Sequence, residues 1–495
     1  MKYRKIKVGK QYKNRTNLML FLLFTCFTLC LSVGYAALNR ELKISGEATF
    51  RVDADIRITS VSLYETENVG LENYNSNYSK NTIKLGVDLK QVNSTVSYKV
   101  VVVNKGNVAM WINSISQEIN NNDNMEYVIN GIGIKELIEP ATTKEFIVKI
   151  KYKDSITTLP NNTNLDTVLK FDFKKPMSIL KNEGAWTTKV FGGTLTKDKI
   201  ENITFLPTLD PVENAIGYWD ASANKDGTVI ASYKDSDNNG LYELYIGGIG
   251  KVYSPAWSAY LFQRYSVLTS INSTNYFDTS NANDMTYMFN ECFKLETLNT
   301  SYFDVGKVTT MTGLFSGCKA LTSLDVSNWD VSKVTSFYML FLSCRKLSNL
   351  DVSNWNVSNV KNMREAFNGC SSLPVIDVSN WDVSKVENMQ QVFLNCSSVE
   401  TLDVSNWNTA NSTTMGGMFS GCRKVSVLNV KNFNTSKVIS MGSMFQGCSA
   451  LIELDVSKFI TSNVTSMRSM FQNCSALMKI DVSGFITSNV TDMGS

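Results

Sequence analysis

The sequence predicts a mixed β and α/β protein in which a β-sandwich precedes a solenoid of short repeats. An aromatic column recurs every 26 residues from Phe277 to Phe485, and strand-like runs separated by turn residues fill residues 37 to 175. A column of eight cysteines keeps the same 26-residue interval: Cys292, Cys318, Cys344, Cys370, Cys396, Cys422, Cys448 and Cys474. A fixed interval of this kind indicates one structural unit repeated along the chain.

Each repeat is predicted to begin with a short strand and to end with a short helix. In the LDVSNW units, Leu, Val and Trp alternate with polar residues, which is typical of a strand with one buried face. Farther along, Phe337, Phe341 and Cys344 are spaced by three and four residues, as on one face of a helix. A glycine such as Gly369 often precedes the cysteine and suits the left-handed end of a helix. The sequence therefore predicts a leucine-rich-repeat-like solenoid over residues 271 to 495, truncated within its last coil.

Residues 1 to 36 are interpreted as an export signal. Seven cations precede Leu18, the apolar run LMLFLLFTCFTLCLSVGYAAL follows, and no Asp or Glu occurs before residue 37. Cleavage after Ala36 is expected, although an apolar run of about 20 residues can also remain as an uncleaved anchor. Loss of the seven cations changes the formal charge from +3 to −4, which disfavours nucleic-acid binding. We expect an exported protein, secreted or at the cell surface, whose only membrane contact is this segment.

Two segments separate the signal from the repeats. Residues 37 to 175 hold seven strand-like runs and no cysteine, and they predict an immunoglobulin-like β-sandwich that acts as a spacer. Residues 176 to 270 contain fewer clear strands, and Trp186, Trp219 and Trp257 supply large apolar anchors. This second segment is expected to cap the solenoid by covering Phe277 and the face of the first coil.

At LDVSNWDVSKV, followed by NMxxxF and GCSSL, the sequence strongly resembles the BspA-like leucine-rich-repeat surface proteins, a class that includes mycoplasma surface lipoproteins. The resemblance covers residues 271 to 495 and extends to GTVIASY, LYIGG and LFQRY before them. It implies a cell-surface location, no catalysis, and attachment to host or neighbouring-cell macromolecules, often extracellular-matrix proteins. Phe337, Ser412 and Asn429 depart from the family pattern without breaking the 26-residue interval.

Catalytic chemistry finds no support in the sequence. The chain has no histidine, which excludes Ser-His-Asp and Cys-His nucleophile arrangements and every histidine metal site. No Walker-type loop occurs, and GGIG at 247 to 250 is an isolated turn. We therefore expect no enzyme, no catalytic residue, no metal and no cofactor.

Two columns allow both a structural and a functional interpretation. Stacked cysteines about 4.8 Å apart permit vertical disulfides, whereas their parallel side chains favour reduced core thiols. The outward strand carboxylates can share a cation or can cap backbone amides in their own turns. These carboxylates are Asp325, Asp351, Asp377, Asp403, Asp455 and Asp481.

Two further surface patterns have alternatives. The column Trp329, Trp355, Trp381 and Trp407 can be a carbohydrate platform, but its interval matches the core columns and Phe replaces Trp freely, which favours core packing. The basic pairs Arg345-Lys346 and Arg423-Lys424 can bind an acidic ligand or can be solvated loops.

The expected function is binding of extracellular or cell-surface proteins or glycoproteins, as in adhesion, through the non-catalytic solenoid. The alternative is a structural component of the cell surface or biofilm matrix that self-associates. A secreted glycan-acting enzyme using Asp325 with Asp330 has less support, because Asn356 and Ile460 replace the second carboxylate in other coils. The sequence leaves the ligand and the oligomeric state open.

Overall fold

The computed structural model describes residues 42–44, 48–50, 55–67 and 75–494, except for residues 107, 108, 135 and 186. The chain forms two compact units, Met1–Pro176 and Met177–Ser495. The predicted export signal and Trp186 lie outside the described residues. Within the described ranges, no helix is long and apolar enough to span a bilayer.

The first unit contains two antiparallel sheets and a small hairpin, β1 (Leu42–Ile44) with β2 (Ala48–Phe50). One sheet has the order β3 (Ile56–Glu67), β6 (Thr95–Asn104), β10 (Thr143–Tyr152) and β8 (Met125–Asn130). The other has the order β4 (Asn75–Tyr78), β5 (Thr82–Asp88), β11 (Asn164–Lys174), β7 (Met110–Asn120) and β9 (Leu137–Ile138).

One apolar core joins the two sheets of the first unit. Along β6, alternate residues such as Tyr98 and Val100 are buried, because successive side chains of a strand point to opposite faces. The Tyr98 hydroxyl donates to the carbonyl oxygen of Gly86 on β5 at 3.0 Å, which ties one sheet to the other.

The second unit begins with a six-stranded sheet. Its order is β13 (Gly217–Asp220), β14 (Val229–Lys234), β15 (Tyr242–Gly248), β12 (Ile200–Leu206), β17 (Ser270–Asn272) and β19 (Thr297–Leu298). The remaining elements are 3-10 helices η1 (Lys197–Lys199) and η2 (Thr274–Tyr276), and strands β16 (Val252–Tyr253), β18 (Phe277–Asp278), β20 (Ser323–Leu324) and β21 (Asn349–Leu350).

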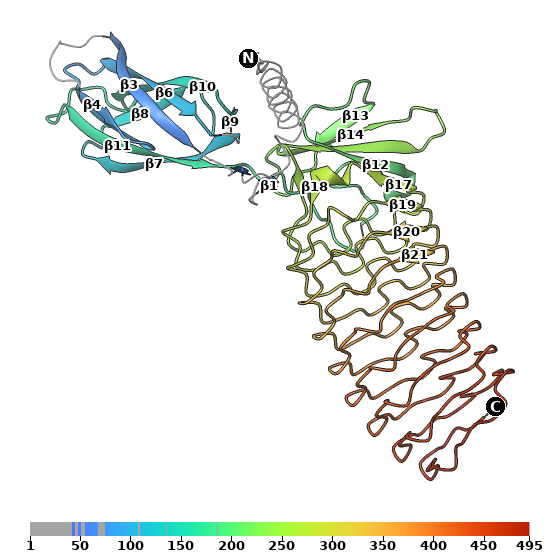
Figure 1. The fold of residues 1–495 in the computed structure, drawn as a ribbon. Coiled ribbons are helices and arrows are strands. Elements are labelled where there is room, and N and C mark those ends of the chain that lie inside the picture. Colours follow the sequence, from blue (N-terminus) through green and yellow to red (C-terminus); the bar gives the residue numbers. More distant parts are fainter. Residues whose placement is uncertain are drawn as a thin grey trace, which may run out of the picture. The chain divides into compact units, whose positions relative to one another are not determined.

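The six-stranded sheet and the coils share one core. The ring of Phe205 on β12 stacks on Phe277, with centroids 4.5 Å apart and ring planes 14° apart. Residues 257 to 494 then form successive coils, which we call the coil stack. Figure 1 shows these coils side by side from the β17–β21 region to the C-terminus.

The predicted α/β class, with one helix in each coil, is wrong. No α-helix occurs among the described residues, and the segment predicted to be helical is a run of turns. Two residues in this segment of each coil have positive φ, for example Met339 (57°) and Ser343 (61°), then Glu365 (59°) and Gly369 (76°). An α-helix of L-residues does not contain such positions, because left-handed backbone brings Cβ close to the following carbonyl oxygen.

Backbone hydrogen bonds explain why turns replace the helix. The N–H groups of Phe337, Met339, Phe341 and Ser343 donate to carbonyl oxygens of the next coil over 2.6 to 2.9 Å. The intervening N–H groups, such as that of Leu340, donate three residues back within their own coil. Alternate amides therefore serve two neighbours, whereas an α-helix directs every amide four residues back.

The strand predicted at the start of each coil is reduced to two residues or to a single bridge. β20 pairs in parallel with β21 through Leu324 and Leu350, and later coils retain isolated bridges such as Val375 with Thr401. A second ladder of isolated bridges connects Ser336, Asn362 and Asn388. Two parallel ladders and the inter-coil amides hold the stack together.

Candidate functional site

The tryptophan column lies inside the coil stack. Trp329, Trp355, Trp381 and Trp407 are all buried. The Trp355 ring stacks on that of Trp381 with centroids 6.3 Å apart and planes 4° apart, and its Nε1–H donates to the Val326 carbonyl at 3.0 Å. These indoles therefore offer no exposed stacking face.

The cysteine column holds free thiols. Cys292, Cys318, Cys344, Cys370, Cys396, Cys422 and Cys448 are buried, and Cys474 is half-buried. The Cys344 Sγ donates to the Phe315 carbonyl of the preceding coil at 3.2 Å, and Cys370 repeats this contact with Phe341. Burial raises the pKa of the Cys344 thiol to about 12. A neutral, enclosed thiol is a poor nucleophile and metal ligand.

The predicted carboxylate ladder lies on the coil surface, and each member engages its own turn. Asp325, Asp351, Asp377, Asp403, Asp455 and Asp481 are exposed. Oδ1 of Asp351 accepts from the Ser353 amide at 3.0 Å and from its hydroxyl at 2.7 Å, which lowers the pKa of the carboxyl. Each of the other members accepts from the amide, the hydroxyl or both of the serine two residues on. Nowhere in the described part of the chain do three or more Cys, Asp or Glu residues form a group that could hold a metal.

The two basic pairs differ in their surroundings. Arg345, Lys346, Arg423 and Lys424 are all exposed. Lys424 forms an ion pair with Glu400 at 2.9 Å across neighbouring coils. That pair is exposed at both ends and contributes little to stability.

A buried lysine, Lys197, lies near the start of the second unit. Lys197 is 6% exposed, and burial lowers its pKa to about 8. Its Nζ lies 5.4 Å from the ring centroid of Tyr265, whose hydroxyl is buried without a hydrogen-bond partner among the described residues. Burial raises the pKa of Tyr265 well above its ordinary value.

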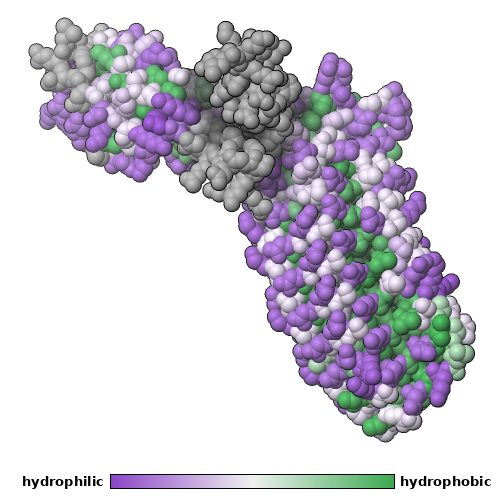
Figure 2. All heavy atoms as spheres, in the orientation of Figure 1, coloured by the Kyte–Doolittle hydropathy of each residue, from purple (hydrophilic) through white to green (hydrophobic). Residues whose placement is uncertain are grey.

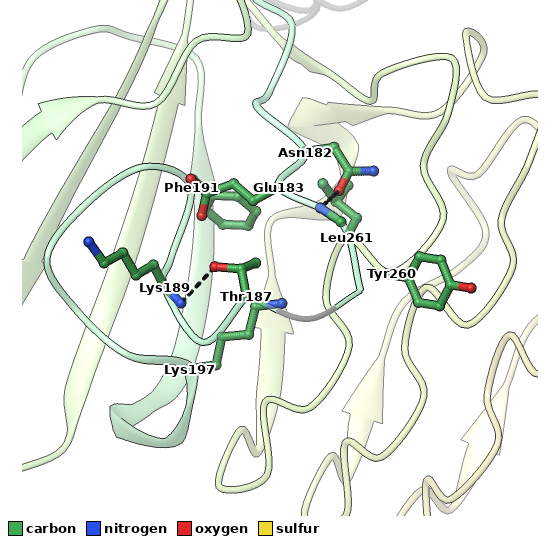
Figure 3. Close-up of a pocket in the computed structure, with 9 residues that line it drawn as sticks. Asn182, Glu183, Thr187, Lys189, Phe191, Lys197, Tyr260 and Leu261 are labelled. Atoms are coloured by element: carbon green, nitrogen blue, oxygen red, sulfur yellow. Dashed lines mark hydrogen bonds between the residues drawn. The ribbon is translucent and has the colours of Figure 1, made fainter.

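Figure 3 shows the small pocket beside Lys197. The Asn182 side chain accepts from the Gly184 amide at 3.0 Å, and the Lys189 amide donates to the Thr187 hydroxyl at 3.1 Å. The space among these residues does not admit a water molecule. Sequence reasoning missed Lys197, because its burial depends on Tyr265, which is distant in the chain.

A loop at residues 235 to 240 was also missed. Its pattern, Asp235-x-Asp237-x-Asn239-Gly240, matches the first half of a calcium-binding loop, but the buried Ile246 occupies the position of the last acidic ligand. The Asp235 carboxylate accepts from the amides of Asn239 at 3.0 Å and Gly240 at 3.1 Å. The Asp235 carboxylate is thus occupied by hydrogen bonds from backbone amides of the same loop.

The visible face of the coil stack is mainly hydrophilic, and hydrophobic residues gather toward its C-terminal coils in Figure 2. Exposed apolar side chains in that part of the chain include Val427 at 71% and Ile439 at 54%. The surface therefore changes chemistry along the stack while the inward columns stay constant.

One family model matches the repeat region of the chain. The family model described as "Mycoplasma protein of unknown function, DUF285" matches residues 259–375, 346–427, 365–478 and 421–495. Neither a search of curated proteins nor a search of solved structures finds a match. The overlapping matches follow the repeats, and no leucine-rich-repeat family is among them. Residues 259–495 are therefore similar to a repeat family of Mycoplasma proteins.

Proposed function

We propose that the protein is an exported cell-surface protein that binds extracellular or cell-surface proteins or glycoproteins through the outward side chains of the coil stack, without catalysis. The export signal predicted in residues 1 to 36 and the similarity to a Mycoplasma repeat family support the location. The absence of histidine from the sequence supports a binding role over catalysis.

One outward column carries the proposal. Thr335, Lys361, Glu387, Thr413 and Ile439 occupy the same position in five successive coils, and all are exposed. Each of their amides donates to the carbonyl of the equivalent residue one coil earlier, over 2.8 to 2.9 Å. The backbone fixes these positions while the side chains change from hydroxyl to cation, anion and alkyl. Such a scaffold presents a specific surface without altering its core.

Binding to immobilised fibronectin, fibrinogen, collagen and mucin tests the proposal. The full-length chain should bind at least one of them, and a chain ending at Pro176 should not. Lys361→Glu and Glu387→Lys should each weaken binding and change its salt dependence, because rim charges act mainly on association. The same Lys-to-Glu exchange on the first unit, Lys149→Glu, is the matched control. Equal binding by all variants would contradict a role for the outward column.

Self-association is the second candidate function. Val427 and Ile439 favour it, because both are apolar side chains that remain largely exposed on the coil stack. Sedimentation at increasing protein concentration separates the two candidates. Assembly without binding to any of the four macromolecules would favour the structural role.

A further inference from the structure

We propose that a basic patch on the first coils of the stack binds a sulfated polysaccharide. The patch lies in the turn that follows the cysteine of three successive coils, and it comprises Lys294, Lys319, Arg345 and Lys346. All four side chains are exposed. Clustered Lys and Arg side chains are typical of surfaces that bind sulfated or phosphorylated polymers. The inference rests on the proposed binding function and deepens it by assigning a ligand class to one part of the surface.

Backbone hydrogen bonds between neighbouring coils hold the three turns side by side. The Thr322 amide donates to the Glu296 carbonyl at 3.4 Å, and the Ser348 amide donates to the Thr322 carbonyl at 3.0 Å. These three residues end the three turns. Segments bonded in this way lie about 4.8 Å apart, as in a sheet. The cations therefore form a row along the axis of the coil stack, which suits a linear polymer better than a flat membrane surface.

Little negative charge offsets the basic patch. Glu296 is the only acidic residue in the three turns, which are residues 293 to 296, 319 to 322 and 345 to 348. Within the described ranges, none of the four cations forms an ion pair. The patch thus carries an excess of positive charge that the coils themselves do not neutralise.

The second basic pair provides an internal comparison. Lys424 occupies the position of Lys346 three coils farther along, and it forms an ion pair with Glu400 at 2.9 Å. The residue equivalent to Glu400 beside Lys346 is Thr322, which has no charge. The same turn therefore holds a neutralised cation in one coil and an uncompensated cation in the other.

An aromatic contact positions one cation of the patch. Lys319 Nζ lies 4.5 Å from the ring centroid of Phe293 in the preceding coil, and Phe293 is 37% exposed. A cation–π contact orients an ammonium group without cancelling its charge. Less side-chain entropy is then lost when an anion binds to Lys319.

The chemistry of the patch favours sulfate groups on a linear chain. Sulfate esters stay ionised at physiological pH, so they keep their attraction to exposed cations. The planar guanidinium of Arg345 can donate to two sulfate oxygens at once, whereas the lysines act as point charges. Single-stranded nucleic acid would need successive aromatic faces for its bases, and Phe293 is the only aromatic residue in the three turns.

Binding of the full-length chain to immobilised heparin at a series of salt concentrations tests the inference. Wild type should bind, and its affinity should fall as salt rises, because binding releases counterions. Arg345→Ser combined with Lys346→Ser should weaken binding by about tenfold or more and reduce the salt slope by about one to two. Ser371 and Ser372 occupy the equivalent positions one coil later, so this variant copies a turn that the stack already contains.

The matched control is Arg423→Ser combined with Lys424→Ser. It removes the same two residue types, but Lys424 is already paired with Glu400, so heparin affinity should change by less than about twofold. Circular dichroism establishes that each variant is folded. Equal losses in the two double variants, or no loss in the first of them, would overturn the inference.

Thr322→Glu provides a further variant that removes no cation. The new carboxylate would lie beside Lys346 as Glu400 lies beside Lys424, so heparin binding should fall by about threefold or more. Unchanged affinity in this variant would contradict a role for the uncompensated charge of Lys346.

Other polyanions test the ligand class, and the two proposals fail separately. Desulfated heparin and hyaluronan should bind at least about tenfold more weakly than heparin. Tighter binding to phosphatidylserine vesicles or to double-stranded DNA would overturn the assigned class. Heparin binding through the patch, without matrix-protein binding that depends on Lys361 and Glu387, would overturn the outward column alone. The reverse result would overturn the polysaccharide site alone.

Discussion

The buried cysteine column should make the coil stack sensitive to alkaline pH. Seven thiols are buried, and burial raises the pKa of Cys292, Cys344 and Cys448 to about 12 from the ordinary 9.0. Because the folded pKa lies above the unfolded one, the stabilisation is fully present below pH 9 and is lost as pH rises toward 12. Between these two pKa values the thiols are ionised in the unfolded chain but protonated in the folded one, which favours unfolding.

The size of the effect follows from the number of thiols. One pKa unit corresponds to about 1.4 kcal/mol, so at about pH 10 each buried thiol costs roughly that amount of unfolding free energy. Seven thiols acting together would remove about 10 kcal/mol, against a total of about 5 to 15 kcal/mol for a typical domain. The second unit should therefore unfold between about pH 9.5 and 10.5.

Urea titrations at successive pH values between about 7 and 10 would measure this loss. Far-UV circular dichroism follows the coils, and tryptophan fluorescence follows the stacked indoles. Cys370→Ala is the matched variant, because it removes one titrating thiol and the Sγ contact to the Phe341 carbonyl. It should lower stability at pH 7 and reduce the pH slope by about one-seventh. A urea midpoint that stays constant between pH 8 and 10 would refute the reasoning.

Three other predictions concern single side chains. Lys197→Met should raise stability at pH 7 by about 3 kcal/mol, because the folded lysine has a pKa of about 8, and the gain over wild type should fade between pH 8 and 10.5 as the unfolded lysine also loses its proton. Trp381→Ala should cost about 3 to 5 kcal/mol in urea unfolding, whereas Asp377→Ala, which breaks only an exposed turn, should cost about 1 kcal/mol. Gly369→Ala should destabilise by about 1 to 2 kcal/mol because of its φ of 76°; a stabilisation, as expected at a helical glycine, would contradict the turn structure.

The sequence alone identifies the inward columns of the coils, because burial imposes a constant interval. The spacing predicts that Trp355, Phe341 and Cys344 lie in the core, and all three are buried. Spacing does not distinguish a helix from consecutive turns, since both can return a side chain to the core after three or four residues. Backbone N–H groups donate alternately within their own coil and to the next coil. This pattern depends on the neighbouring coil, so the sequence of a single repeat does not reveal it.

A local signal against the helix was nevertheless present. Gly313 and Gly317, and again Gly417 and Gly421, are four residues apart within one coil, and all four have positive φ. One glycine suits a helix end, but a second glycine one turn earlier weakens a helix. Paired glycines at a fixed separation indicate two left-handed positions per coil.

The contact between Tyr260 and Tyr287 was hidden for a different reason. Tyr260 and Tyr287 are 27 residues apart, one more than the regular interval, so the alignment of later coils does not place them in one column. Their stacking emerges only when the first coil is built. The buried Gln263 side chain likewise donates through Nε2 to Asn290 in the next coil, a contact that the local sequence does not indicate.

The left-handed column connects the scaffold with its surface. Each such residue without glycine costs about 1 to 2 kcal/mol relative to right-handed backbone. Inter-coil hydrogen bonds and aromatic stacking offset this conformational free energy in every coil. The left-handed position therefore accepts residues as different as Tyr287, Met339 and Ser443. Conformational cost at a given residue is therefore no indication of function by itself. The first coils differ because two stacked tyrosine rings occupy adjacent left-handed positions, and because the following position is Gly313, which leaves room for the Tyr287 ring.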